Sequence, residues 1–448
     1  MALAMSALLA LCGCQGLKSN SQSQSVNHII FMAQENRSFD TYYGQLPAYW
    51  QANGYSAVQF DGLPANASNP SFDGTTTVPA FHVATECIQN LSPSWNESHE
   101  DWNRQDPTSK TPTMDGFVFN AASYAMNAPA DEAPIYDTAG IRAMGYYDES
   151  DLNYYYFMAS NFATSDRWFA PAMDRTQINR MYLLAATSQG YAYPPGTNAS
   201  DNAPLTAPTI FDALQQAGIS WKVYTTDTTA GADPVTYLTM FAPYAAPKKL
   251  PANVVPASQF LSDAKNGTLP QVAMIEGGYN SGLDEHPKNN VQTGAAYVSG
   301  LINGLMNSPS WQDSVFILTY DEPGGLYDHV PPQPAVNPDG IAPKDLQPGD
   351  ICTTPGGANC NFNYTGFRVP LLVVSPFTKK HYVSHTVADY TAILTFIETT
   401  FGLSPLTKRD AAQMDMSEFF DFQNPPWTTP PKPPAQATNG VCDYQHLQ

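Results

Sequence analysis

Short apolar runs alternate along this chain with longer amphipathic segments. Runs with branched side chains predict buried strands at 26–32 (VNHIIFM), 220–225 (SWKVYT), 271–275 (QVAMI), 315–320 (VFILTY) and 369–374 (VPLLVV). Segments 210–217, 295–306 and 388–401 have apolar residues at helical spacing. Strands that alternate with helices indicate βαβ units, so we expect an α/β fold with a mostly parallel central sheet and helices on both faces.

Residues 40–160 do not follow this pattern. They are rich in Asn, Ser, Pro and Tyr and show little periodicity. The whole chain holds 39 prolines and 29 glycines, many outside the periodic segments. We therefore expect residues 40–160 to form a loop-rich cap over the sheet.

Composition excludes several classes of protein. The chain has 40 acidic and 20 basic residues, a formal charge of −20, and no basic cluster, which argues against nucleic-acid binding. No apolar run reaches the ~18 residues of a membrane span, so a polytopic membrane protein is excluded. The 448 residues are 43% hydrophobic, which is enough for a large core and excludes general disorder.

The two ends of the chain predict processing and a strap. Residues 2–11 are largely apolar and precede Cys12-Gly13-Cys14, which resembles the cleavage box of a bacterial lipoprotein signal with Cys14 as the lipidated residue. An ordinary polar tail is the alternative. We expect a signal, anchor and tether over 1–25, one domain over 26–424, and a Pro-rich strap over 425–448. The protein would then be exported, as an envelope lipoprotein, a periplasmic protein or a secreted one. Membrane contact would come only through the anchor or the substrate.

If Cys12 is removed and Cys14 is lipidated, four cysteines remain, and an even count in an exported protein suggests two disulfides. Four cysteines allow three pairings. We favour Cys352–Cys360 as a local link and Cys87–Cys442 as a long-range one. Four free, buried thiols are the alternative.

Two acidic pairs follow predicted strands directly. Glu35-Asn36 follows the first strand, and Asp321-Glu322 follows the strand at 315–320. Ligands of parallel α/β sheets bind beyond the carboxyl ends of the strands, where these pairs would meet. Two carboxylates ~4 Å apart repel by about 4 kcal/mol at an effective dielectric near 20, so three need a cation. Oxygen ligands suit one divalent ion, with Ca, Mg, Mn, Zn and Fe all allowed. Taken singly, each pair is more often a helix cap or surface charge.

Thr176 opens the segment TQINR and precedes a helical run. A hydroxyl at a helix N-terminus ordinarily caps the helix. Alternatively, Thr176 is a nucleophile activated by metal contact, with Arg180 and the helix dipole favouring an anion beside it.

Histidines lie close in sequence to these polar segments, at His99, His286, His329 and His385. An imidazole can protonate a leaving oxygen or stabilise a transferring phosphoryl group. A hydrogen-bonded structural imidazole is the alternative for each.

Taken together, these segments resemble the phosphoesterase family of bacterial and plant non-specific phospholipases C and related bacterial acid phosphatases. That family has an alkaline-phosphatase-like fold. The resemblance runs in the family's order over about residues 27–422 and rests on Glu35–Asp40 (ENRSFD), Met114–Phe117, Met144–Tyr147, Thr176–Arg180, Glu285–Pro287, Thr319–Val330 (TYDEPGGLYDHV), Arg368–Pro370 and Lys408–Asp410.

The resemblance implies a role for each matching residue. Thr176 matches the nucleophile and would also contact the metal, whose other ligands match Glu35, Asn36, Asp321 and Glu322. His286 and His329 match histidines of the phosphate pocket. His99, His385 and Asn179 are assigned to the substrate pocket, and Arg180 to catalysis.

The chain departs from the family pattern at a few positions. Ile178 replaces a usual Pro, Pro323 replaces a polar residue, and Ser92-Pro93 replaces an Asp-His. The last two changes remove substrate contacts but leave the expected metal ligands and nucleophile in place.

We expect a metal-dependent phosphoesterase that works through a phosphothreonine. A threonine nucleophile favours a phospholipase C acting on phospholipids. The compact length favours the alternative, an acid phosphatase acting on monoesters. A third hypothesis, from another class, is a non-catalytic envelope lipoprotein that binds phosphorylated ligands.

Overall fold

The computed structural model describes residues 25–448 except 57–59, 197–202 and 355. The predicted signal and lipidation segment, with Cys14, lies outside the described residues. No helix in the described part of the chain has the length and hydropathy that a membrane span requires.

A central eight-stranded sheet forms the core. Its spatial order is β13 (Tyr382–Ser384), β6 (Ala163–Ser165), β12 (Leu371–Val374), β11 (Ser314–Tyr320), β1 (His28–Gln34), β10 (Val272–Glu276), β8 (Trp221–Thr225) and β9 (Val254–Pro256). All neighbouring strands run parallel except at β12, which is antiparallel to both β11 and β6. The predicted α/β fold with a mostly parallel sheet is confirmed.

The central strands are buried on both faces. β1, β10, β11 and β12 consist almost entirely of buried residues, which explains why they read as continuous apolar runs and were predictable. Three strands of the central sheet were not predicted from the sequence, β6, β9 and β13, and each has three residues. Three residues are too few to show a period.

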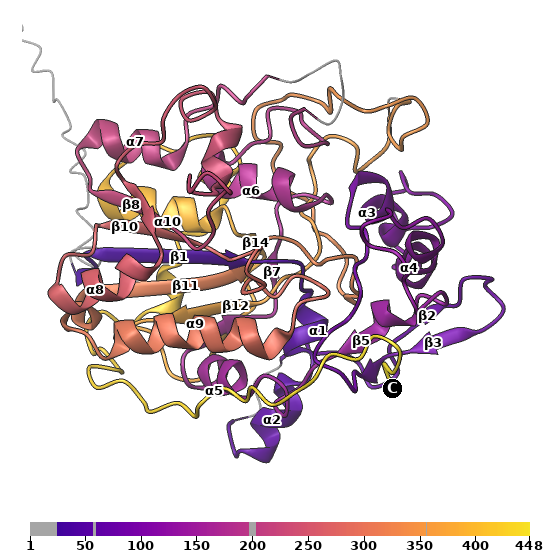
Figure 1. Ribbon diagram of the computed structural model, residues 1–448, viewed down its shortest axis with the longest axis horizontal. Coiled ribbons are helices and arrows are strands. Elements are labelled where there is room, and N and C mark those ends of the chain that lie inside the picture. Colours follow the sequence, from indigo (N-terminus) through magenta and orange to yellow (C-terminus); the bar gives the residue numbers. More distant parts are fainter. Residues whose placement is uncertain (1–24, 57–59, 197–202, 355) are drawn as a thin grey trace, which may run out of the picture.

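Helices cover both faces of the sheet (Figure 1). One group comprises α5 (Asn153–Asn161), α8 (Ser258–Asn266) and α9 (Val291–Met306), of which α9 contacts the other two. The other comprises α6 (Thr176–Ala185), α7 (Ile210–Ala217) and α10 (Ala392–Phe401). In Figure 1, α5 and α9 lie below the central strands and α6 and α7 above them.

Two predicted helices have different starts. α10 begins at Ala392 and not at Ala388, because Ala388–Asp389 forms strand β14, which pairs with β7 (Trp168–Phe169). α9 begins four residues early, at Val291, because the Asn290 side chain accepts hydrogen bonds from the amides of Gln292 and Thr293.

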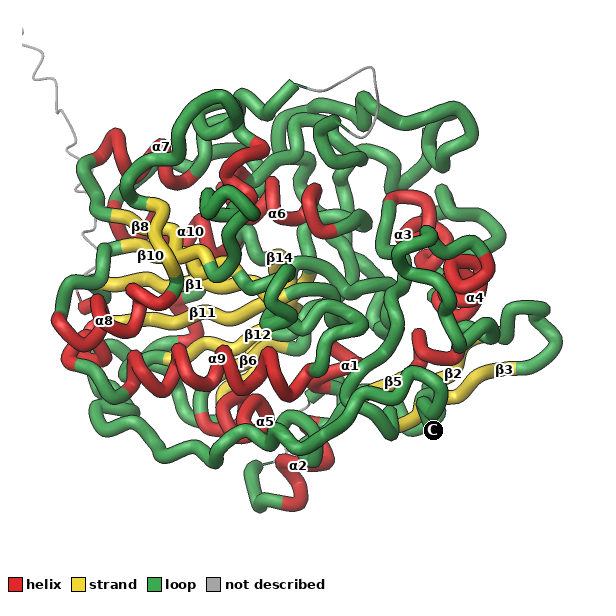
Figure 2. The backbone as a smooth tube through the Cα atoms, in the orientation of Figure 1, coloured by secondary structure: helices red, strands yellow, loops and turns green. Residues whose placement is uncertain are grey.

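The cap is more regular than predicted. It contains α1 (Phe39–Tyr43), α2 (Leu46–Ala52), α3 (Trp95–Trp102), α4 (Phe117–Met126), η2 (Ile141–Met144) and the short strands β2 (Ser68–Pro70), β3 (Thr77–Pro79), β4 (Phe81–His82) and β5 (Gly145–Tyr146). These elements are short and are joined by long loops, as Figure 2 shows. Each is therefore too short to give a recognisable hydrophobic period in the sequence. Single-turn helices η3 (Tyr237–Met240), η4 (Pro309–Asp313), η5 (Asp410–Ala412) and η6 (Ser417–Phe419) lie elsewhere.

The C-terminal segment 425–448 has neither helix nor strand and runs over the surface of the domain. The main-chain carbonyl of Trp427 accepts a 2.9 Å hydrogen bond from the Trp311 indole. The Cys87–Cys442 disulfide joins its end to the cap, and a Cys352–Cys360 disulfide closes a local loop. Both favoured pairings are therefore confirmed.

Candidate active site

The two acidic pairs meet because their strands are neighbours. β1 and β11 pair in parallel with Gln34 opposite Tyr320, so Glu35-Asn36 and Asp321-Glu322 leave the same edge of the sheet side by side. The Asp321 carboxylate fixes this turn by accepting hydrogen bonds from the amides of Asn36 (3.0 Å) and Glu322 (2.8 Å).

A glycine makes the close approach of these turns possible. Gly324 has a φ of +74°, and a Cβ there would lie 2.6 Å from the Asn36 carbonyl oxygen. A side chain at this position would push the two turns apart. The glycines of the motif DEPGG therefore serve the geometry of the acidic cluster.

Thr176 is the first residue of α6, and its hydroxyl lies among the acidic pairs. Thr176 Oγ1 is 3.2 Å from Glu35 Oε2, 3.4 Å from Asn36 Oδ1 and 3.5 Å from Glu322 Oε1. The residues that the sequence predicted as nucleophile and ligands, 140 and more positions apart, thus lie together. This is also the N-terminus of a ten-residue helix, where the backbone favours an anion.

Arg180 lies elsewhere than predicted. Its Nη2 donates to the carbonyls of Ala33 (3.0 Å) and Gln34 (3.2 Å) and to Glu35 Oε1 (2.8 Å). Its Nε lies 3.6 Å from Asp321 Oδ2. The guanidinium is buried behind the carboxylates and does not line the cavity in front of Thr176. Arg180 therefore neutralises the cluster from behind, and its predicted effect on an anion beside Thr176 stays a prediction.

The charges of the cluster are incompletely balanced. Burial, followed by the charge of Glu35, raises the pKa of Asp321 well above its usual range. Burial and the charge of Asp321 raise the pKa of Glu322 in the same way. Burial also opposes ionisation of Glu35, but Arg180 and His286 outweigh it and lower its pKa. Arg180 is the cation in direct contact with these buried carboxylates, and the charge of Arg175 acts on Glu322 in addition.

This donor set fits a divalent ion. It offers carboxylate and amide oxygens with a hydroxyl beside them, and Asp321 Oδ2 is buried with no hydrogen-bond partner. The ligand oxygens of Glu35, Asp321 and Glu322 do not all lie within 4.8 Å of one another. Among the described residues, the groups with all ligand atoms within 4.8 Å are Asp40, Asp328, His329 and His82, Asp148, Asp151.

The front of Thr176 opens into a polar cavity of about 330 Å³. Glu35, Asn36 and Thr176 form its floor, and the cap contributes Asn90, Ser92, Pro93, Tyr124 and Asp131. His286 also lines it. Its Nδ1 lies 2.9 Å from the Pro287 carbonyl, which can only accept, so Nδ1 carries the proton. No hydrogen bond to Nε2 comes from the residues that the structure describes. His286 is therefore placed to exchange a proton with a bound molecule through Nε2.

His329 is not in this cavity. Its Nδ1 lies 2.7 Å from Asp40 Oδ2 and its Nε2 lies 3.1 Å from Asp61 Oδ1, so both nitrogens are engaged. Arg368 donates to Asp328 (2.8 Å) and Asp40 (2.9 Å), so its guanidinium supplies the positive charge of this group. His329 belongs to a buried ion network beside the site.

The remaining pocket predictions are also misplaced. His99 is fully buried, with Nδ1 2.7 Å from the Trp95 carbonyl, and burial lowers its pKa to about 4. His385 is 47% exposed and contacts Asp166 at 2.9 Å. Asn179 is buried and holds the loop before α6 through Ala172 and Asp174. None of the three lines the cavity in front of Thr176.

Two residues of the site escaped the sequence analysis. Arg175, directly before Thr176, lines the cavity, and within the described residues no hydrogen bond or ion pair engages its guanidinium. Its position next to Thr176 in the sequence was the available signal. Tyr237, on η3, donates from its hydroxyl to Glu35 Oε1 at 2.9 Å and places its ring 4.9 Å from the Arg180 guanidinium. No sequence pattern indicates Tyr237.

Comparison with known proteins identifies the family of this chain. Residues 26–404 match the profile of the Phosphoesterase family. The chain belongs to the Phosphoesterase family. It is 30% identical to Phospholipase C B of Mycobacterium tuberculosis, over 91% of this chain and 80% of that one. It is 29% identical to Non-specific phospholipase C5 of Arabidopsis thaliana, over 88% of this chain and 74% of that one. This phosphoesterase is therefore a hydrolase that acts on phosphoester bonds.

A solved structure from the alkaline phosphatase superfamily of Vibrio parahaemolyticus is similar at a TM-score of 0.35 and 12% identity. The match covers 79% of this chain and 74% of that one. A similarity at this level adds nothing to the family assignment.

Proposed function

We propose that this phosphoesterase is a metal-dependent phospholipase C with Thr176 as its nucleophile. The supporting observation is the position of Thr176 Oγ1, within 3.5 Å of oxygens of Glu35, Asn36 and Glu322. The alternative of a non-catalytic binding protein is less favoured, because the hydroxyl and the whole expected ligand set are present and adjacent.

The ligands of the metal would be Glu35, Asn36, Asp321 and Glu322, with the hydroxyl of Thr176 beside them. A divalent ion bound there would balance the carboxylate charge and favour the alkoxide form of the nearby hydroxyl. The proposal is supported by the pKa values of Asp321 and Glu322, which burial and the neighbouring carboxylates raise, because a bound cation would oppose both effects.

The residues of the chain divide the remaining work. Thr176 passes its hydroxyl proton to the Glu35 carboxylate, 3.2 Å away, as Oγ1 attacks phosphorus in line. The bond from phosphorus to the alcohol oxygen breaks, and the head group stays on Thr176 as a phosphothreonine ester. His286, in the imidazolium form with a proton on each nitrogen, protonates the leaving oxygen through Nε2, and the neutral ring then takes a proton from the water that hydrolyses the ester. Thr176 recovers its proton from Glu35 as the ester bond breaks. The N-terminal amides of α6 and the Arg175 guanidinium hold the anionic oxygens.

The names of the relatives favour a phospholipid over a monoester as substrate. Two positions at which this chain departs from the family pattern lie on the cap side of the cavity. Ser92 and Pro93, which replace the Asp-His of the resemblance, both line it. We therefore expect the head-group preference to differ within the family at these positions, while the chemistry at Thr176 is retained.

We also propose that the protein is exported. The supporting observation is the presence of two disulfides, Cys87–Cys442 and Cys352–Cys360, because disulfides persist in oxidising compartments. Lipid attachment at Cys14 belongs to the same proposal.

The direct test compares phosphatidylcholine, a phosphate diester and a phosphate monoester, each with and without a chelator. The proposal expects release of phosphocholine and diglyceride, loss of turnover with chelator, and recovery on adding a divalent ion. A monoester rate far above the lipid rate would favour an acid phosphatase. Tight phosphate binding without any turnover would favour the binding protein.

A further inference from the structure

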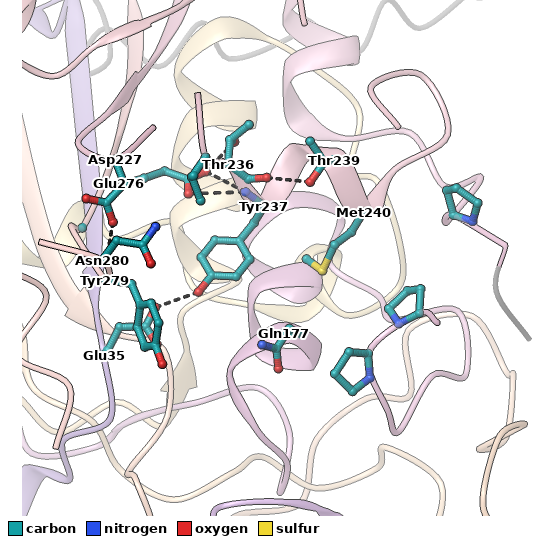
Figure 3. A pocket seen from close by; sticks show the side chains of 15 residues that line it. Glu35, Gln177, Asp227, Thr236, Tyr237, Thr239, Met240, Glu276, Tyr279 and Asn280 are labelled. Carbon is teal, nitrogen blue, oxygen red and sulfur yellow. Dashed lines mark hydrogen bonds between the residues drawn. The ribbon is translucent and has the colours of Figure 1, made fainter. Parts of the chain in front are cut away.

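A second cavity adjoins the polar one. It has a volume of about 550 Å³, within the usual range of about 300–1,000 Å³ for ligand pockets. The two cavities share Glu35, Gln177, Tyr237 and Tyr279 as lining residues. Glu35 and Tyr237 thus line both cavities, and Figure 3 shows them joined by a hydrogen bond in the second one.

The walls of the second cavity are chiefly apolar. Val235, Met240, Pro194, Pro195 and Pro204 line it together with the two tyrosine rings. Figure 3 shows Met240 and Tyr237 projecting into it beside Gln177. By contrast, the polar cavity is lined by Arg175, His286 and side chains of the cap. The two sides of the site therefore suit different chemical groups.

Two carboxylates of the second cavity, those of Asp227 and Glu276, accept hydrogen bonds from other groups of the protein. Asp227 accepts hydrogen bonds from the Asn280 amide (2.6 Å) and the Ser281 hydroxyl (2.8 Å). Glu276 accepts from Thr236 Oγ1 (2.7 Å) and the Tyr237 amide (3.1 Å). The bonds of Glu276 hold the start of η3, and those of Asp227 hold the loop at Asn280 and Ser281. Both carboxylates thus serve the structure of the wall, and Gln177 Oε1, which has no partner among the described residues, is left to meet a polar atom of a ligand.

Two apolar side chains of this cavity are exposed to solvent. Val235 is 37% exposed and Tyr279 is 49% exposed, and both are among the large exposed hydrophobic residues of the described chain. Exposed apolar residues that gather at a cavity beside a reactive centre mark a site for an apolar ligand.

We propose that the second cavity binds the acyl-bearing diglyceride part of the substrate, which orients the head group into the polar cavity beside Arg175 and His286. This inference rests on the proposed phospholipase C activity and adds a binding site for the leaving alcohol. Met240 and Val235 are then specificity-determining residues, since they touch acyl carbons and take no part in bond breaking.

The test measures kcat/KM on a monomeric series with one head group: glycerophosphocholine, dibutyroyl phosphatidylcholine and dihexanoyl phosphatidylcholine. For the wild type, kcat/KM should rise about fourfold for each methylene that enters the cavity. Met240→Gln keeps the side-chain size and adds polarity. It should reduce the ratio of the dihexanoyl to the glycerophosphocholine rate by about fivefold or more.

Leu261→Gln is the matched control, since Leu261 is 42% exposed on α8 and lines neither cavity. It should leave the chain-length dependence unchanged. A flat chain-length series in an active wild type, or a Met240→Gln series parallel to that of the wild type, would overturn the inference while leaving the phosphoesterase activity standing. Absence of turnover on every phosphoester tested would refute the proposed function itself, and the inference with it.

Discussion

Arg180 Nη2 donates a 2.8 Å hydrogen bond to Glu35 Oε1, while the other oxygen of the same carboxylate lies 3.2 Å from Thr176 Oγ1. Thr176 and Arg180 are four residues apart on α6, so they lie on one face of that helix. One helix therefore presents the hydroxyl in front of Glu35 and the balancing cation behind it. This arrangement fixes the orientation of Glu35 before any ligand binds.

The substitution Asp321→Asn removes the negative charge of this side chain but keeps an oxygen that can accept hydrogen bonds. The amide oxygen can still accept from the Asn36 and Glu322 amides, and the loss of one negative charge relieves the repulsion from Glu35 that, together with burial, raises the pKa of Asp321. We expect the metal-free stability to change by less than about 1 kcal/mol. Stabilisation by added metal, about 2.7 kcal/mol at 100 times Kd for the wild type, should vanish together with turnover.

Thermal unfolding with and without chelator measures this, with the exposed Asp106→Asn as a control that keeps the metal effect. Undiminished metal stabilisation of Asp321→Asn would show that the ion binds elsewhere, for instance at the group of His82, Asp148 and Asp151.

The two histidines of the resemblance should behave oppositely. His286→Ala removes the imidazole that faces the cavity, so kcat should fall about 10²–10⁴-fold with little change in stability. His329→Ala leaves the buried Asp40 short of a partner and should lower the free energy of unfolding by about 1–3 kcal/mol, with kcat largely kept. Steady-state kinetics and urea unfolding of both variants measure these losses. A larger loss of kcat in His329→Ala than in His286→Ala would place the proton donor at His329.

Glu276 gives the stability a pH dependence. Burial raises its pKa from 4.5 to about 7, so the folded protein holds this proton more tightly than the unfolded chain. Protonated Glu276 therefore adds to the free energy of unfolding at low pH. This stabilisation is lost as the pH rises from about 4.5 to 7, and it stays lost above pH 7. In Glu276→Gln this loss is absent, so wild-type stability relative to the variant should fall by about 3 kcal/mol over that interval. Urea unfolding at several pH values measures it, and a constant difference would contradict the assignment.

The two disulfides should differ in their effect on stability. Cys87 and Cys442 are separated by 355 positions and Cys352 and Cys360 by 8. Since loop-closure entropy grows with the logarithm of loop length, replacing the first pair by serine should cost about 3 kcal/mol more than replacing the second. Unfolding of the two double variants tests this, and equal losses would mean that the strap retains its contacts in the unfolded chain.

The predictable parts of the fold were those with a strong local signal. Strands such as β11 are buried on both faces and read as apolar runs, and parallel pairing then brought Glu35 and Asp321 to one edge. β14 was missed because Ala388 and Asp389 pair with a distant two-residue strand, a contact that no local pattern encodes. The cap helices were missed because they are short.

In the site, sequence indicated which residues gather but not which way they face. Arg180 was expected to favour an anion beside Thr176. In the structure its guanidinium donates hydrogen bonds to the carbonyls of β1 and to the Glu35 carboxylate. His329 was expected in the pocket, yet Asp40 and Asp61 engage both of its nitrogens. Tyr237 reaches Glu35 across a separation of 202 positions, which only the tertiary structure reveals.

The most direct measurement is acid-quench mass spectrometry of the enzyme during turnover of phosphatidylcholine, with Thr176→Ala and Thr176→Ser beside the wild type. We expect a phosphocholine adduct on the peptide that contains Thr176, none in Thr176→Ala, and residual turnover only in Thr176→Ser. An adduct on another residue, or wild-type turnover by Thr176→Ala, would contradict the assignment of Thr176 as nucleophile.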